Sequence, residues 1–279
     1  MDLEIARIER PVVRQGNGQV IAKRILIDTD DMRSISPFLR FSEDWFAAPG
    51  GFETHPHRGM QTVTIVLEGA LHHRDHTGAD GVLRAGDVQW MTAGRGVLHS
   101  EMPYESELAH TLQLWLNLPS KLKMVPARYT DQRADSVPVR REGGAEFHVY
   151  AGRSGNLDRA HGSDWPLMFI DMRIEAGMDI MHEVPAGWRG FLYFVEGSAQ
   201  AGANMASAVA PDMAWFEPAG EAGGAPVQLR ISATENVRVL LFAGPPIDEE
   251  IVAYGPFVMN TQQEIQQAFT DYQNGVLTG

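Results

Sequence analysis

The chain of 279 residues contains no cysteine. Disulfides, thiolate nucleophiles and thiolate metal sites are therefore excluded, and any metal ion must be held by histidine and carboxylate side chains. Basic residues are in deficit, because 23 Lys and Arg stand against 36 Asp and Glu and give a net charge of −13. Such a surplus of negative charge repels nucleic-acid phosphates and anionic lipid surfaces, so direct binding to either is not expected.

Long apolar runs are also absent. No window approaches the roughly 20 apolar residues of a membrane span. The opening segment MDLEIARIER mixes charged with aliphatic residues, where a secretory signal would carry an unbroken apolar core. Neither a phosphate-binding glycine loop nor a nucleophile elbow occurs in a suitable context. We therefore expect a cytoplasmic protein that uses neither nucleotide chemistry nor a serine nucleophile.

Short β-forming runs are what the sequence has in abundance. Each is about 5–8 residues long and bounded by Gly, Pro, Asp or Asn, which is typical of all-β sandwiches and barrels. A good helix is predicted only near the end, where Thr261 and Glu264 fit a capping box and Gly275 can terminate the helix. The runs are RILIDT, TVTIVLEGALHHRD, DVQWMTA, HTLQLWLNLP, FHVYAG, LMFIDMRI, GFLYFVEGSAQAG, DMAWFEP, VQLRISA and VRVLLFAG.

Two pairs of matching motifs indicate an internal duplication. TIVLEGAL and LYFVEGSA share a Glu-Gly turn, and their residues Glu68 and Glu196 are 128 positions apart. GDVQWM and PDMAWF share Asp-x-x-Trp, and Trp90 and Trp215 are 125 positions apart. Glu-Gly turns are common, but two motifs in the same order and at nearly the same spacing favour a repeat.

The repeat sets the expected organisation of the chain. We expect two antiparallel β-barrels, near residues 1–130 and 140–245, joined by the polar stretch TDQRADSVPVRREGGAE. Residues 246–279 then form a tail whose helix packs back on the barrels. The fold class is all-β with one C-terminal helix.

Four side chains in the first half have the spacing of a metal site. FETHPHRG places His55 and His57 two residues apart, and AGRGVLHSE places His99 and Glu101 at the same spacing. Because side chains alternate along a strand, each pair shares one face, and all four converge if the segments lie on adjacent strands. Three imidazoles and a carboxylate suit a divalent Fe, Ni, Cu, Mn or Zn ion and leave coordination positions open.

The second half provides an internal control. A lone His-x-His is more often a pair of surface or hydrogen-bonded histidines, but the second pair behind a glycine-rich turn favours a metal site. Aligned on the Glu-Gly turns, only His182 corresponds to the first pair, and no histidine follows it. At the positions that correspond to the first-half motifs, the second barrel therefore cannot build a site with three histidines.

Several neighbours are candidates for supporting roles. His73, in LHHRDHTGAD, is either part of a network behind the ligands or one of several solvated histidines. Arg58 could pair with an anionic substrate or form an ordinary surface ion pair. Gln61 could fix the orientation of a ligand imidazole. In LQLWLN, either the face with Gln113 and Trp115 or the opposite leucine face could line a cavity.

These residues resemble the pirin family, a branch of the cupins. The resemblance rests on HPHRGMQTVTIVLEG, GDVQWMTAGRGVLHSEMP, LQLWLNLP and GPFVMNT, and it is densest over residues 50–120. It implies a bicupin, that is, two jelly-roll barrels, with one metal, usually iron, in the N-terminal barrel only. The family's ligands carry over onto His55, His57, His99 and Glu101. Many relatives have Glu where this chain has Gln61.

The resemblance implies two kinds of function. Some bacterial pirins resemble quercetin 2,3-dioxygenases, which open a flavonol ring with O2; Glu101 is then both ligand and general base for the flavonol hydroxyl. Animal pirins resemble redox-sensitive cofactors of transcription factors, and some bacterial ones are implicated in binding a metabolic enzyme, so the alternative is an iron protein that acts through a protein partner. A third reading is a cupin acting on another small carbonyl or enol.

Overall fold

The computed structural model describes residues 1–16, 20–27, 31–105, 108–159 and 162–279. Its elements divide between two compact units. The first unit comprises Val12–Ser136 with Ile247–Gly279, and the second comprises Met1–Pro11 with Val137–Pro246. Within the described ranges, none of the helices is long and apolar enough to cross a membrane.

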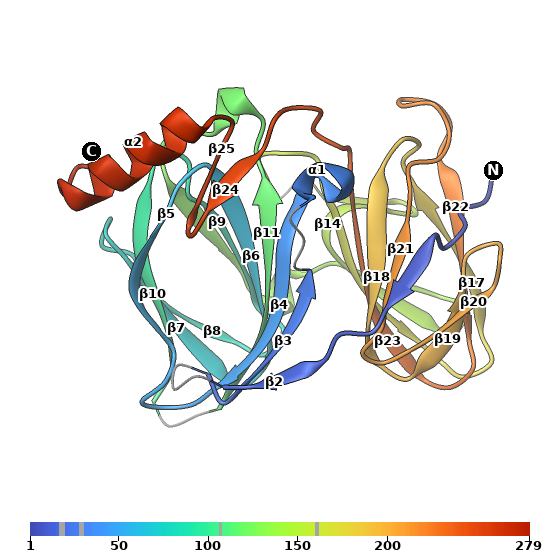
Figure 1. Ribbon diagram of the computed structural model, residues 1–279. Helices are drawn as coiled ribbons and strands as arrows, with labels where there is room; N and C mark the ends of the chain where they lie inside the picture. Colours follow the sequence, from blue (N-terminus) through green and yellow to red (C-terminus); the bar gives the residue numbers. More distant parts are fainter. Residues whose placement is uncertain (17–19, 28–30, 106–107, 160–161) are drawn as a thin grey trace. The chain divides into compact units, whose positions relative to one another are not determined.

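The first unit is built from two antiparallel sheets. One has the strand order β12-β9-β6-β11-β4-β3-β2, and the other has the order β5-β10-β7-β8. Figure 1 shows these strands in blue to green, with the red helix α2 alongside them. The strands are β2 (Val13–Gln15), β3 (Ala22–Ile27), β4 (Phe38–Phe46), β5 (Phe52–His57), β6 (Met60–Glu68), β7 (Ala70–Asp75), β8 (Asp80–Arg84), β9 (Val88–Thr92), β10 (Val97–Pro103), β11 (Ala109–Asn117) and β12 (Arg128–Gln132).

The second unit repeats this plan. Its larger sheet has the order β1-β21-β18-β23-β16-β14-β13, with β15 paired to β14, and its smaller sheet has the order β17-β22-β19-β20. The strands are β1 (Arg7–Glu9), β13 (Val139–Glu142), β14 (Ala145–Ser154), β15 (Leu157–Arg159), β16 (Met168–Ile174), β17 (Asp179–Val184), β18 (Arg189–Glu196), β19 (Ser198–Ala201), β20 (Ala206–Val209), β21 (Met213–Phe216), β22 (Val227–Ala233) and β23 (Val237–Gly244). The all-β class with two barrels is confirmed.

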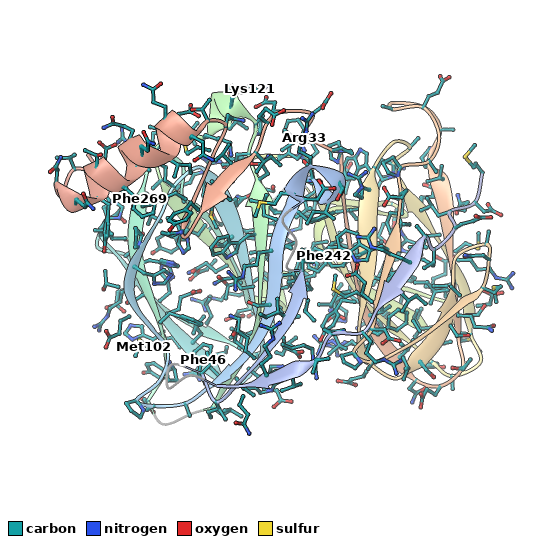
Figure 2. All side chains as sticks on the ribbon, viewed as in Figure 1. Arg33, Phe46, Met102, Lys121, Phe242 and Phe269 are labelled. Carbon is teal, nitrogen blue, oxygen red and sulfur yellow. The ribbon has the colours of Figure 1, made fainter. Side chains whose placement is uncertain are left out.

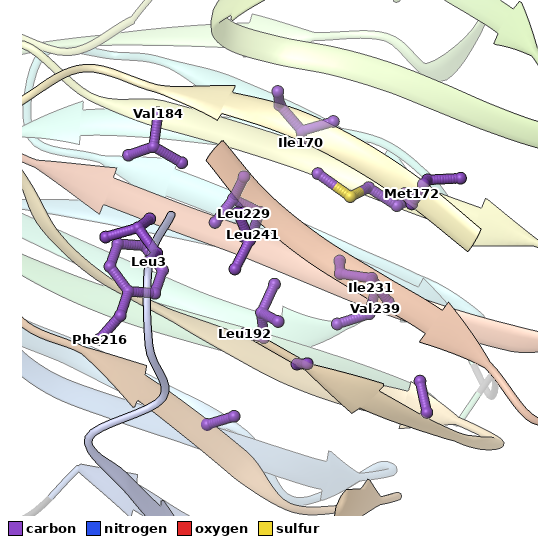
Figure 3. Packing of buried hydrophobic residues seen from close by; sticks show 14 of the residues in the cluster. Leu3, Ile170, Met172, Val184, Leu192, Phe216, Leu229, Ile231, Val239 and Leu241 are labelled. Carbon is purple, nitrogen blue, oxygen red and sulfur yellow. The ribbon is translucent and has the colours of Figure 1, made fainter. Parts of the chain in front are cut away.

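Aliphatic and aromatic side chains fill the interior of the second barrel. Figure 3 shows this packing, in which Ile170, Leu192, Leu229 and Leu241 meet from both sheets. Each of the four is fully buried. Burying such a side chain contributes about 1.5–3 kcal/mol, so this barrel is stabilised by an ordinary apolar core.

The start of the chain belongs to the second unit, whereas residues 1–130 were expected to form the first barrel. β1 pairs with β21, and Leu3 and Ile5 are buried in the apolar core of the second barrel. These two residues alternate with charged ones, so they present one apolar face that the second barrel covers.

The end of the chain belongs to the first unit. β24 (Val252–Tyr254) and β25 (Phe257–Met259) form a hairpin, and helix α2 (Gln262–Gln273) follows it. The predicted capping box is confirmed, because Thr261 and Glu264 satisfy each other's backbone N–H groups. Phe269, labelled in Figure 2, lies 4.9 Å from Phe257, ring centroid to ring centroid. The helix thus packs on the hairpin of its own unit.

A buried lysine secures this hairpin. The Lys123 side chain follows the one-turn helix Ser120–Leu122 and is 1% exposed. Its Nζ donates to the carbonyl oxygens of Gly59 (2.8 Å) and Val258 (3.1 Å) and to Asn117 Oδ1 (2.7 Å). Desolvation lowers the pKa of Lys123 to about 7. The remaining short helices are α1 (Met32–Ile35) and the turn Ala134–Ser136.

Candidate metal centre

The two pairs of candidate ligands in the sequence lie on neighbouring strands. β5 carries His55 and His57, and the antiparallel strand β10 carries His99 directly opposite His55. The ring centroids are 4.3 Å apart for His55 and His99, 4.9 Å for His55 and His57, and 5.0 Å for His57 and His99. Their candidate ligand nitrogens all lie within 4.8 Å of one another. The two segments therefore occupy adjacent strands, which is the condition for the convergence expected from the sequence.

Two glycines shape the turn before β10. Gly94 has φ +49° and Gly96 has φ +153°. A Cβ on Gly96 would lie 2.2 Å from the carbonyl oxygen of Leu277. Only glycine therefore allows the C-terminal tail to approach the strand that carries His99.

Glu101 joins a second group of candidate ligands. β10 has a register shift between His99 and Glu101, and Glu101 lies opposite His73 of β7. His73, His99 and Glu101 offer ligand atoms that are again within 4.8 Å of one another. The structure therefore gives two overlapping triads that share His99. The sequence left open whether His73 supports the ligands or is solvated, because its position depends on the register of β7 against β10.

Hydrogen bonds fix the orientation of the Glu101 carboxylate. Its Oε1 accepts from Thr64 Oγ1 at 3.1 Å, and its Oε2 accepts from Gln113 Nε2 at 2.8 Å. Gln113 Oε1 in turn accepts from Trp115 Nε1 at 3.0 Å. The face of β11 that carries Gln113 and Trp115, rather than its leucine face, therefore supports the centre.

Three of the histidines are buried, and burial disfavours the charged form of each imidazole. Desolvation lowers the pKa of His57 to about 3, although the Pro256 carbonyl acts weakly in the opposite direction. Burial also lowers the pKa of His99 well below its usual range, and it lowers that of His73. In the described part of the chain, no ring nitrogen of these three has a hydrogen-bond partner of normal geometry.

These unpaired nitrogens fit a metal ion. Leaving a buried polar atom without a partner costs about 1–3 kcal/mol, so several in one cluster call for a ligand. The half-buried His55 is already oriented, because its Nδ1 donates to the Glu53 carbonyl oxygen at 2.7 Å and leaves the Nε2 lone pair for coordination. Neutral imidazoles with one carboxylate suit a divalent transition ion.

A cavity of about 280 Å³ opens onto this cluster. Its walls come from both sheets of the first unit and from the tail. The tail contributes Gly255 and Pro256, between β24 and β25. The lining residues are Lys23, Arg40, Ser42, Asp44, Phe52, His55, His57, Glu101, Gln113, Trp115, Gly255 and Pro256.

The second barrel builds no comparable cluster among its described residues. His182 of β17 is buried, and its Nε2 lies 3.1 Å from Ser154 Oγ, which itself accepts from Arg140 Nε. Desolvation lowers the pKa of His182 to about 4. Among the described residues, the groups that could hold a metal ion lie in the first barrel.

Two other sequence candidates have structural partners. Arg58 is buried and donates to Asp271 Oδ2 at 2.7 Å and to the Leu277 carbonyl at 3.2 Å. It thus ties the tail to the turn after β5, a role the sequence did not suggest because Asp271 is 213 residues away. Gln61 Nε2 donates to Thr92 Oγ1 at 3.0 Å.

Two β-barrels of this architecture, one of them gathering histidines and a carboxylate beside a cavity, define a bicupin. Residues 7–116 match the family model described as pirin, and residues 169–278 match the pirin C-terminal cupin domain. The chain belongs to the pirin family. The resemblance noted in the sequence is confirmed over most of its length.

Three known proteins resemble this chain, the third of them in its fold alone. Pirin-like protein 2 of Arabidopsis thaliana is 39% identical, over 96% of this chain and 85% of its own. The structure of a quercetin 2,3-dioxygenase from Acinetobacter baumannii is 30% identical with a TM-score of 0.85, covering 99% of this chain and 96% of that one. A bacterial pirin from Escherichia coli in complex with nickel(II) is 24% identical with a TM-score of 0.66, covering 85% and 100%.

Proposed function

We propose that the protein is a metal-dependent dioxygenase of the quercetin 2,3-dioxygenase type, which opens the ring of a flavonol-like substrate with O2. The observation that carries the proposal is the cluster of buried imidazoles that have no hydrogen-bond partner among the described residues, beside a cavity lined by His55 and His57. The similarity to the Acinetobacter enzyme supports the reaction class.

His55, His57, His99 and Glu101 are the proposed ligands, one metal per chain. Iron is the first candidate, and Ni, Cu, Mn and Zn suit the same donors. An iron ion held there would supply the electron transfer to dioxygen that ring opening requires. His73 lies opposite Glu101 and belongs to the second candidate ligand group, with His99 and Glu101.

Glu101 is the proposed general base. Its carboxylate lines the cavity and is held by Thr64 and Gln113, so it is aimed before substrate arrives. Taking the proton from the 3-hydroxyl of a flavonol leaves the substrate as its enolate, the form that reacts with oxygen. Phe52 and Trp115 provide apolar walls that exclude water from the ring.

Elemental analysis followed by an oxygen-electrode assay with quercetin tests the proposal. We expect about one transition metal per chain and O2 uptake that matches quercetin loss, both abolished in His99→Ala. His182→Ala is the matched control, because this histidine is equally buried in the other barrel; it should retain both. A protein that binds no transition metal would refute the ligand assignment.

If the protein binds a metal but does not turn over quercetin, this result would distinguish between the two functions implied by the family. In that case the ligand assignment stands, and the dioxygenase assignment fails in favour of a redox-sensing iron protein that acts through a protein partner. Binding of such a partner would then follow the oxidation state of the metal.

A further inference from the structure

Arg40 is an unusual component of the cavity wall. It lies on β4 with Ser42 and Asp44 on the same face, directly opposite Trp115 of β11. All four residues line the cavity. The Arg40 side chain is half-buried and makes no hydrogen bond or ion pair with any described residue. A cation in such a position normally has a partner, because burial removes part of its hydration.

Two other charges of the cavity, those of Lys23 and Asp44, compensate each other. Lys23 Nζ lies 2.9 Å from Asp44 Oδ1, and Asp44 also accepts from Ser42 Oγ at 2.8 Å. Glu101 is held by neutral donors and faces the histidine cluster. Once a divalent metal is bound beside Glu101, the unpaired guanidinium makes the cavity positively charged even though the protein as a whole carries −13.

Aromatic contacts hold Arg40 near the metal ligands. Its Cζ lies 5.7 Å from the centroid of the Trp115 ring, within cation–π range. The Trp115 ring meets the His57 ring edge to face, with 5.1 Å between centroids. Arg40, Trp115 and His57 therefore form a continuous wall that ends at the proposed metal.

A second cavity of about 220 Å³ adjoins this wall. Arg40, Trp115 and Gly255 line both cavities, and the second is otherwise mostly apolar, with Ile27 and Leu39 among its lining residues. The guanidinium thus stands between a metal-facing space and an apolar one. A substrate with an acidic group and a hydrocarbon or aromatic body matches this arrangement of surfaces.

We propose that Arg40 is a specificity-determining residue that binds an anionic group, a carboxylate or ionised phenol, of the physiological substrate. The planar fork of donors suits a carboxylate in particular. The inference rests on the proposed function, because the metal anchors the other end of the substrate. It narrows the physiological substrate to an aromatic or enolic compound that carries an acidic group, and the cavity of about 280 Å³ limits its size.

Two probes that differ only in charge test this assignment. The first is 3,4-dihydroxybenzoate and the second is its methyl ester, and both present the same catechol to a metal. Calorimetric titration into protein loaded with zinc measures their affinities without turnover. We expect the acid to bind the wild type at least about tenfold more tightly than the ester, as a charge-assisted hydrogen bond provides.

Arg40→Met keeps the apolar stem over Trp115 but removes the charge. We expect it to weaken binding of the acid about tenfold and to leave the ester unchanged, whereas Arg40→Lys should keep part of the preference. Arg14→Met is the matched control, because Arg14 is exposed on β2 outside the cavity lining. It removes the same charge from the same unit and should change neither affinity.

The outcomes separate this inference from the proposed function. Failure of the wild type to bind zinc would overturn the metal site, and with it the present inference. Zinc bound with equal affinity for acid and ester would overturn the role of Arg40 alone. Equal weakening of both probes in Arg40→Met would also overturn it, since the arginine would then serve only to pack against Trp115.

Discussion

Truncating one histidine in each barrel gives a sharp test of where a metal binds. His57→Ala and His182→Ala remove the same side chain from positions that are each 2% exposed. Both should lower the metal-free stability by about 1–3 kcal/mol, because each leaves a small cavity. His182 additionally loses its contact with Ser154. Without metal, both variants should therefore be destabilised within this same range.

Addition of metal should separate them. A metal at 100 times its Kd stabilises a folded protein by about 2.7 kcal/mol. For a unit of this size, each kcal/mol raises Tm by roughly 2–4 °C, so a rise of roughly 5–11 °C is expected for the unit that contains Val12–Ser136. Wild type and His182→Ala should show this rise in Tm. His57→Ala should lose most of it, because one of three converging imidazoles is missing.

Scanning calorimetry with zinc or with a chelator measures these shifts in Tm. Because the protein has two compact units, the transition of each unit is followed separately. Equal metal-induced shifts in the two variants would refute the assignment of the site to β5 and β10. A metal-induced rise in Tm that His57→Ala keeps and His182→Ala loses would place the metal in the other barrel. It would also contradict the use of His182→Ala as a control.

Two further predictions concern residues that support the centre. Gln113→Leu should lower kcat with quercetin about 10–100-fold while one metal per chain is retained, because Glu101 loses the donor at 2.8 Å that aims it; unchanged kcat would contradict this role. Lys123 has a folded pKa of about 7, below its unfolded value, so between pH 7 and about 10.5 the unfolded state binds more protons and the wild-type free energy of unfolding should rise with pH. Denaturant unfolding of Lys123→Met should lack this rise and exposed Lys121→Met should keep it; an unchanged slope in Lys123→Met would show that Lys123 stays charged in the fold.

Local patterns were sufficient to predict the strands that alternate clearly and the helix that carries its own capping box. The convergence of His55, His57 and His99 was also predictable, because alternation along a strand fixes the face of each pair. β4 was missed, since its buried Ser42, Glu43 and Asp44 interrupt the apolar pattern. The partners of these residues lie on other strands and are not evident from the local sequence.

Long-range register accounts for the other omissions. His73 joins the cluster only because β7 pairs with β10 so that His73 faces Glu101. From the sequence alone, Arg58 could be an ordinary surface residue. In the fold it is buried and pairs with Asp271. Such contacts depend on the pairing of segments far apart in the chain, which composition and spacing do not encode.

The exchange of chain ends between the units has a consequence for biosynthesis. The barrel with the candidate centre needs Ile247–Gly279, and the ribosome makes these residues after the whole of the other barrel. More than 200 residues are therefore translated after Arg58 before its partners Asp271 and Leu277 are made. The candidate ligands lie in an incomplete barrel during that time, so the candidate centre takes its final form only after residues 247–279 have been made.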